Sequence, residues 1–402
     1  MAKKNKPAIR FKEFTDAWEQ RKLSEIAGKV TEKNTGLQYV ETLTNSAEFG
    51  IISQRDFFDH DISKLGSLDG YYIVRNEDFV YNPRISTSAP VGPINRNKLG
   101  RTGVMSPLYT VFRPHDIDTT YLEHFFKCGY WYSFMNFNGD SGARSDRFSI
   151  KDDVFFQMPI PVPHIEEQRK IGLFLTQLDH LITLHQRKYD KLQVLKKAML
   201  EKMFPKNGSS VPEIRFKGFT DAWEQRKLGD CFTERCESMP DGELISVTIN
   251  DGIKKFSELG RHDNSNDDKS KYKKVCAGDI AYNSMRMWQG ASGCSPYEGI
   301  VSPAYTVLTP NSGINSKCMA YQFKLPATIH TFKINSQGIT SDNWNLKFPA
   351  LSEIEIYVSP YEQEQAKIAA YFANLDHLIT LHQRELEKLQ NIKKSMLEKM
   401  FV

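Results

Sequence analysis

The sequence predicts a mixed α/β protein with two similar globular domains separated by two long helices, which pair as an antiparallel intramolecular coiled coil. Three observations support this fold class. A segment near the N-terminus recurs in the middle of the chain, shorter motifs recur in the same order after each copy, and each copy ends in a long stretch almost free of glycine and proline. An internal repeat of this kind indicates two equivalent structural units related by a pseudo-two-fold operation.

The repeat is strongest at its beginning, where residues 9–23 recur as 214–228 with 14 of 15 positions identical. Three further pairs follow in the same order: 78–82 with 279–283, 103–114 with 299–310, and 178–187 with 375–384. These repeated segments match closely, while the stretches between them differ in length and sequence. Binding residues concentrate in loops, so we interpret the two copies as diversified for different ligands; a second copy that merely drifted is the alternative.

The matched segments divide the chain into successive parts. These are a first domain at 1–163 with the motif 9–23, a first long helix at 164–205, a linker at 206–213, a second domain at 214–360 with the motif 214–228, and a second long helix at 361–402. Within the domains, strand-like runs such as 71–74, 109–112 and 305–308 alternate with turns rich in Gly, Asn, Asp and Pro, which is typical of short strands.

The two long helices carry a shared apolar seam. Residues 166–204 and 363–401 contain no glycine or proline except Gly172. With alternating four- and three-residue spacing, eight of ten seam positions in each segment are apolar or aromatic, as in a coiled coil. The exceptions, histidine and lysine, fall at the same places in both helices. Antiparallel pairing would put His185 and His382 in adjacent layers, and Leu178 and Leu375 each close to the partner helix.

Composition limits the function without deciding it. A net charge of +4 and a pI near 8.5 permit nucleic-acid binding but fall short of an obviously basic binder. The basic N-terminus and the lack of a long apolar run predict a cytoplasmic protein. None of the six cysteines forms a CxxC pair, so we expect reduced thiols and no metal site.

Motifs of DNA-processing enzymes are missing from the sequence. There is no GxxxxGK[ST] loop for nucleotide phosphates, no GxGxxG and no HExxH. Asn82-Pro83-Arg84 is the nearest approach to the Asn/Asp-Pro-Pro-aromatic motif of adenine methyltransferases, but it lacks the second proline and the aromatic residue. A chain of this size with a duplicated plan and no catalytic signature is expected to recognise a ligand rather than to catalyse a reaction.

The entry into each long helix resembles the P-x-x-x-E-Q-x-x-I segment of the specificity subunits of type I restriction-modification systems. Residues 163–171 and 360–368 both carry this pattern, and Leu-Asp-x-x-Ile follows each of them. The Trp-Glu-Gln-Arg-Lys-Leu segments at 18–23 and 223–228 extend the resemblance. It covers nearly the whole chain, twice and in the right order.

This resemblance implies a non-catalytic subunit whose two target-recognition domains each read one half of a bipartite, asymmetric double-stranded DNA target. It implies two methyltransferase subunits docked on the helices and two restriction or translocase subunits, with no membrane role. S-adenosylmethionine, ATP and Mg²⁺ are then expected in the partner subunits, and no cofactor in this chain. Together these subunits would methylate adenine and restrict unmodified foreign DNA.

Candidate DNA-contacting residues lie in equivalent turns of both copies. Arginine commonly reads guanine, and asparagine reads adenine. The first domain supplies Asn82, Arg84, Arg144, Ser145 and Arg147, and the second supplies Asn283, Arg286, Trp288, Ser341, Asn343 and Trp344. Gly142-Ala143-Arg144 resembles a family loop that faces DNA, whereas the second copy has Thr340 in place of the arginine.

The helices also carry apolar residues outside the seam, and this surplus predicts that a second protein packs on the outside. The residues chosen for this contact are Phe174, Leu181, Leu184, Leu378 and Leu381.

Two alternatives to the assignment as a type I specificity subunit stay open at this point. One is the specificity subunit of a related type II system with a fused nuclease-methyltransferase partner, and the other is a structural coiled-coil scaffold without DNA specificity.

Overall fold

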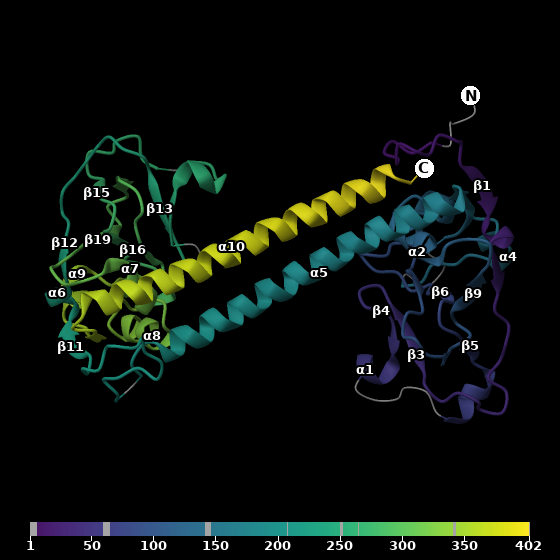
Figure 1. The fold of residues 1–402 in the computed structure, drawn as a ribbon. Helices are drawn as coiled ribbons and strands as arrows, with labels where there is room; N and C mark the ends of the chain where they lie inside the picture. The colour runs from purple at the N-terminus through teal and green to yellow at the C-terminus, as the bar shows by residue number, and fades with distance from the viewer. Residues whose placement is uncertain are drawn as a thin grey trace. The chain divides into compact units, whose positions relative to one another are not determined.

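The computed structural model describes residues 6–58, 65–140, 146–206, 208–249, 252–263, 265–340 and 343–401. The chain divides into two compact units. Unit 1 comprises Met1–Gln186 together with Arg384–Val402, and unit 2 comprises Arg187–Gln383. The two long helices are α5 (Ile165–Lys202) and α10 (Glu362–Lys399). Each begins in the unit of its own repeat and ends in the other unit, so both units contain parts of both helices (Figure 1).

Unit 1 is built from short strands and helices. Its strands are β1 (Glu19–Lys22), β2 (Ala27–Lys29), β3 (Leu43–Ser46), β4 (Gly50–Ser53), β5 (Tyr72–Val74), β6 (Phe79–Tyr81), β7 (Ile94–Arg96), β8 (Gly103–Met105), β9 (Thr110–Pro114) and β10 (Pro159–Val162). Its short helices are α1 (Gln54–Phe58), α2 (Thr119–Lys127), α3 (Tyr132–Asn138) and α4 (Asp152–Phe155), with 3-10 turns at Leu23–Glu25 and Leu65–Gly70.

Unit 2 repeats this series. Its strands are β11 (Glu224–Lys227), β12 (Phe232–Glu234), β13 (Ile245–Thr248), β14 (Gly252–Lys255), β15 (Lys273–Val275), β16 (Ile280–Asn283), β17 (Ser292–Cys294), β18 (Gly299–Val301), β19 (Tyr305–Pro310) and β20 (Glu355–Val358). Its short helices are α6 (Leu228–Cys231), α7 (Ser316–Gln322), α8 (Pro326–Ile334) and α9 (Phe348–Ser352), with 3-10 turns at Phe256–Leu259 and Met287–Gln289.

The sheets of the two units have the same topology. A four-stranded antiparallel sheet has the order β2-β9-β6-β7 in unit 1 and β12-β19-β16-β17 in unit 2. Three two-stranded pairs accompany each sheet, and in both units the first strand pairs with the last, β1 with β10 and β11 with β20. The repeat predicted from sequence is therefore confirmed at the level of strand pairing.

One of the two inner strands of each four-stranded sheet, β6 in unit 1 and β16 in unit 2, packs against apolar clusters on both faces. Phe79 and Tyr81 of β6 face the larger core of unit 1, whereas Val80 between them faces a smaller cluster under β3, β5 and β8. In unit 2, Ile280 and Tyr282 face one core and Ala281 faces the other. Successive side chains of a strand point to opposite faces, so residues 79–81 and 280–282 are continuously apolar. The turn that follows each strand emerges from this rigid layer.

Within each unit, α5 and α10 run antiparallel and pack side by side (Figure 1). In unit 1 an ion pair joins Lys393 of α10 to Asp179 of α5, while Met400 and Phe401 beyond it belong to the same core as Ile171. In unit 2, Lys196 pairs with Asp376 at 2.5 Å. Leu178 shares a core with Leu389, and Leu375 shares one with Leu192, as the seam predicts.

The N-terminal motif is attached to the start of the long helix by a buried ion pair. The guanidinium of Arg10 donates from Nε and Nη2 to the two carboxylate oxygens of Glu167, at 2.6 and 2.7 Å. Arg215 binds Glu364 in the same way in unit 2, at 2.6 and 2.8 Å. Both glutamate side chains are fully buried.

The glutamine that follows each glutamate ties the helix to the globular part of its unit. The side chain of Gln168 accepts from the backbone N–H of Asp118, the N-cap of α2, and donates to the carbonyl of Pro163. Gln365 accepts equivalently from Asn315, the N-cap of α7. The repeated Glu-Gln pair is therefore internal, and it orients each globular part on its helix.

Over the described residues, no helix is both long and apolar enough to cross a membrane. The same residues include no group of three or more His, Cys, Asp or Glu side chains arranged to hold a metal ion.

Candidate nucleic-acid interface

In unit 1 the two candidate segments lie beside each other. Arg84 and Arg147 form an antiparallel β-bridge. The backbone N–H of Ile85 donates to the carbonyl of Asp146 at 3.0 Å, and that of Phe148 donates to the carbonyl of Pro83 at 2.8 Å. Positions more than 60 residues apart in the sequence therefore make one surface at the end of β6.

The side chain of Asn82 forms hydrogen bonds that support this surface. Its Oδ1 accepts the backbone N–H of Arg84 at 3.0 Å, and its Nδ2 donates to the carbonyl of Asn45 at 2.7 Å. Because its donor and acceptor are engaged, Asn82 acts as a turn-forming residue that presents its neighbour. The side chain of Arg84 is 72% exposed, and its guanidinium lies 3.9 Å from the exposed carboxylate of Asp146.

A buried amide network, which the sequence reasoning missed, supports the turn. Asn45 is 1% exposed and donates to the carbonyls of Val80 and Pro93 at 2.7 and 3.2 Å. Asn95 donates to Oδ1 of Asn45 at 2.7 Å. Asparagine side chains inside strands are the only sequence signal of this network. Buried amide groups in proteins are normally hydrogen-bonded. Because Asn45 binds both strand β6 and Asn82, this network fixes the position of the turn.

Unit 2 builds the equivalent turn differently. Oδ1 of Asn283 accepts the backbone N–H of Met285 at 3.0 Å, and its carbonyl accepts that of Arg286. The backbone N–H of Leu346 donates to the carbonyl of Ser284 at 2.9 Å, which joins this turn to the 343–346 segment. Arg286 is exposed. The position equivalent to Asn45 is Val247, which is buried in an apolar cluster.

The two candidate tryptophans hold the unit 2 turn together. The rings of Trp288 and Trp344 meet edge to face, with centroids 5.2 Å apart. The indole N–H of Trp288 donates to the carbonyl of Met285 at 3.1 Å, and the ammonium of Lys333 lies 5.5 Å from the ring of Trp344. Both tryptophans are half-buried, and Asn343 beside them is exposed.

Hollows lie against both turns. One of about 300 Å³ in unit 1 is lined by residues that include Pro83, Leu108 and Arg147. Another of about 710 Å³ in unit 2 is lined by residues that include Asn283 and Arg261. The candidates Arg144, Ser145 and Ser341 lie outside the described residues.

The residues chosen for partner contact on the helices differ in accessibility. Leu181, Leu184 and Leu381 are 40%, 39% and 44% exposed. Leu378 is half-buried. Phe174 is half-buried and packs edge to face on Phe11 of the N-terminal motif, with centroids 6.2 Å apart. Its ring therefore contributes to the core of unit 1.

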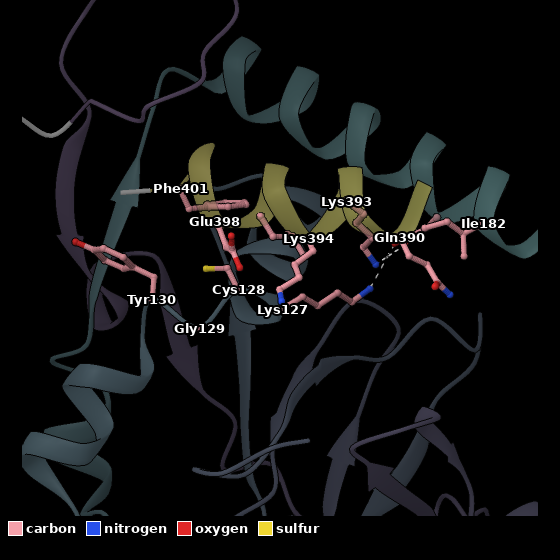
Figure 2. A pocket seen from close by; sticks show the side chains of 12 residues that line it. Lys127, Cys128, Gly129, Tyr130, Ile182, Gln390, Lys393, Lys394, Glu398 and Phe401 are labelled. Atoms are coloured by element: carbon pink, nitrogen blue, oxygen red, sulfur yellow. Dashed lines mark ion pairs between the residues drawn. The ribbon is translucent and has the colours of Figure 1, made fainter. Parts of the chain in front are cut away.

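A separate cavity of about 640 Å³ lies in unit 1 where the end of α2 meets both long helices (Figure 2). Asp179 lies in its wall and pairs with Lys127 at 3.9 Å and with Lys393. Cys128 also lines it, and burial raises the pKa of this thiol to about 12, so it stays protonated. Among the candidate DNA-contacting residues that the structure describes, none lines this cavity.

Comparison with known proteins identifies the repeated units. The sequence profile of the type I restriction modification DNA specificity domain matches residues 15–194 and again residues 220–391. The type I restriction enzyme MjaVIII specificity subunit of Methanocaldococcus jannaschii is 24% identical over 270 residues. That match spans 62% of this chain and 62% of the relative's length.

A solved structure has the same fold. It is the S subunit of the type I restriction-modification system from M. genitalium, with a TM-score of 0.59 at 13% identity, and the similarity covers 99% of both chains. The two-unit architecture with paired long helices is therefore a known fold.

Proposed function

Because the chain belongs to the family of type I restriction modification DNA specificity domains, we propose that it is the DNA-recognition subunit of a type I restriction-modification complex. It reads a bipartite, asymmetric double-stranded target, with one half-site for each unit. The observation that carries this proposal is that two units of identical strand order present different turns at the same place. Arg84 and Arg147 meet in unit 1, whereas Arg286 accompanies two tryptophans in unit 2.

The chemistry of these turns suits readout of base edges. An arginine can donate two hydrogen bonds to O6 and N7 of guanine in the major groove. Such a contact discriminates best when the backbone that carries the arginine is rigid. Asn82 and Asn283 provide this rigidity because each accepts the N–H two residues further on. Nearby lysines and arginines would contact phosphates, which position the protein without reading the sequence.

We assign catalysis to partner subunits. Two methyltransferase subunits, which bind S-adenosylmethionine, dock on the outer faces of α5 and α10, where Leu181, Leu184 and Leu381 are accessible. Two restriction or translocase subunits use ATP and Mg²⁺ to cleave unmodified DNA. The purified chain is then expected to transfer no methyl group, and methyl transfer by the chain alone would contradict this division of labour.

The main test is to co-express the chain with its methyltransferase subunit and to map methylated adenines across the host genome. We expect one asymmetric two-part motif. Exchanging residues 24–163 for those of another family member should change one half of this motif and preserve the other. A simultaneous change in both halves would refute independent reading, and the absence of any sequence-specific methylation would refute the proposed function.

Arg84→Ala and Arg286→Ala test the readers one at a time. Each is expected to relax a single half-site and to weaken binding there by about 1–3 kcal/mol, because a bidentate arginine–guanine contact is lost. The measurement is equilibrium binding of the assembled complex to duplexes with every base at each position. Arg75→Ala, which removes an exposed arginine paired with Glu32 at 2.9 Å, is the control. A uniform loss on all sequences would mark a phosphate contact instead.

A further inference from the structure

Unit 2 exposes an apolar side chain, Ile339, in a segment that is hydrogen-bonded to the turn carrying its candidate DNA contact Arg286. Gln337 and Asn345 exchange two backbone hydrogen bonds, at 2.9 and 2.8 Å, which hold these two positions together. Gly338 has φ +148°, and a Cβ there would lie 2.6 Å from the carbonyl oxygen of Asn343. Ile339 follows directly, and it is 99% exposed.

The residues around Asn345 are held against the Arg286 turn at two points. Leu346, just after Asn345, donates to the carbonyl of Ser284, and Trp344 packs on Trp288. Met285, between Ser284 and Arg286, is 42% exposed. Two accessible apolar side chains therefore accompany Arg286 on neighbouring, mutually fixed segments. Neither side chain is needed to complete a core.

The equivalent surface of unit 1 has a different character. There Arg84 bridges to Arg147, and its side chain lies beside the accessible carboxylate of Asp146. In the repeat, the sequence Gly142-Ala143-Arg144 corresponds to Gly338-Ile339-Thr340. Between the two copies, a small residue followed by a cation is thus replaced by a large apolar residue followed by a hydroxyl.

We propose that Ile339 and Met285 contact the 5-methyl groups of thymines in the major groove, so that unit 2 selects thymine next to the base read by Arg286. The inference deepens the proposed function and rests on it. The methyl group of thymine is the one apolar feature among the base edges of the major groove. An accessible isoleucine on a segment that is hydrogen-bonded to the Arg286 turn matches that feature in chemistry. The major groove is also wide enough to admit a two-stranded ribbon.

The test uses the complex of this chain with its methyltransferase subunit, after the half-site of unit 2 has been assigned by its loss in Arg286→Ala. Binding is measured by competition with duplexes in which thymines of that half-site are replaced one at a time by deoxyuridine, which lacks only the 5-methyl group. We expect about a fourfold loss at one or more positions, equivalent to about 0.8 kcal/mol for one buried methyl group.

The variant Ile339→Ala supplies the decisive comparison. It should bind the thymine duplex several-fold more weakly than the wild type and should no longer distinguish thymine from deoxyuridine at the same position. Val211→Ala, which shortens another exposed apolar side chain of unit 2, at 45% exposure, should keep the distinction. Because Ile339 is exposed, its replacement should leave the melting temperature of the protein unchanged.

Three results would overturn the inference while leaving the proposed function intact. The half-site of unit 2 could contain no thymine on either strand. Deoxyuridine could bind as well as thymine at every position. Ile339→Ala could weaken binding to all sequences equally, as expected for an apolar side chain wedged between base pairs in the minor groove. If the wild-type complex showed no sequence preference, that result would instead contradict the proposed function itself.

Discussion

Replacing Arg10 by alanine is expected to lower the free energy of unfolding of unit 1 by about 3–5 kcal/mol, the range seen when one partner of a buried ion pair is removed. The carboxylate of Glu167 is fully buried and is bound at both oxygens by this guanidinium. Without Arg10, a charge would be left in the interior without its partner. The N-terminal motif would then be held to the start of α5 by its remaining contacts, such as Phe11 on Phe174.

Arg215→Ala provides a matched comparison in unit 2, and we expect a smaller loss there. The hydroxyl of Ser359 donates to Glu364 at 2.5 Å, so that glutamate keeps a hydrogen bond after the arginine is removed. Hydrogen exchange read by mass spectrometry is the appropriate measurement, because a chain of two units need not unfold in one step. Peptides covering β1 and the first turn of α5 report on Arg10, and those covering β11 and the first turn of α10 report on Arg215.

The control for both variants is Arg75→Ala, whose ion pair with Glu32 is about half exposed on each side. Exposed pairs contribute only about 0–1 kcal/mol, so this variant should change little. The double variant Arg10→Leu with Glu167→Leu should recover much of the lost stability, because it removes the buried charge together with its partner. Equal, small effects of Arg10→Ala and Arg75→Ala would contradict the proposal that the buried Arg10–Glu167 ion pair stabilises unit 1.

Acidification from pH 6.5 to about pH 4 is expected to destabilise unit 1 by an amount on the order of 3 kcal/mol. The cause is His124 of α2, which is 2% exposed and whose Nδ1 has no hydrogen-bond partner among the described residues. Its Nε2 lies 3.2 Å from Oγ1 of Thr176 on α5. Burial, followed by the charge of Lys127, lowers the pKa of His124 to about 4.

Charged groups on three elements face this imidazole. Lys127 and Lys393 oppose its protonation, whereas Asp179 and Glu123 favour it. In the unfolded chain the imidazole takes up a proton near its ordinary pKa of 6.5. The unfolded state therefore binds more protons between pH 6.5 and 4, and the stability of unit 1 falls as the pH decreases through this window.

Unit 2 provides an internal reference because Tyr321 stands at the position equivalent to His124. Its hydroxyl donates to Asp376 at 2.8 Å, and a phenol does not titrate in this pH window. Glu123 responds at lower pH, because Lys127, Arg96 and Lys98 outweigh its burial and lower its pKa to about 2. Hydrogen exchange of α2 and α7 at successive pH values measures the difference between the units.

The variant His124→Gln, which cannot take up a proton, should remove the pH dependence between 6.5 and 4 from unit 1. Its stability at pH 8 serves as the reference for any packing loss caused by the substitution. If unit 1 of the wild type is as stable at pH 4.5 as at pH 7, the imidazole is not held neutral. If His124→Gln keeps the full dependence, another group is responsible.

Much of the fold could be predicted because the repeat and the seam are both local patterns. Identical segments such as 178–187 and 375–384 are visible without knowledge of any contact. Alternating four- and three-residue spacing determines which face of each helix is apolar. The strand order was not accessible in this way, because β1 pairs with β10 more than 130 residues later and most strands have only three or four residues. Such short strands carry too little pattern to specify their partners.

The candidate site was accessible only in part. The sequence predicted that arginines lie in equivalent turns of the two units. It did not reveal the hydrogen bonds that determine which side chains face outward. Trp288 and Asn82 were chosen as DNA contacts, and both prove to have internal hydrogen bonds that shape the turns. Ile339 escaped notice because a single isoleucine in a polar segment gives no sign of its exposure.

By itself the sequence determined the duplicated plan, the two long helices and the family resemblance, since each follows from residue identity and spacing along the chain. Only the tertiary structure decided that the Glu-Gln pair at each helix start is an internal clamp and that the last turns of α10 complete the core of unit 1. Phe401, for example, packs on Tyr121 with centroids 5.4 Å apart. Contacts of this kind join residues that lie hundreds of positions apart. These contacts are stabilised by the burial of apolar surface and the pairing of buried charges. The local sequence around each residue does not indicate which distant residue it contacts.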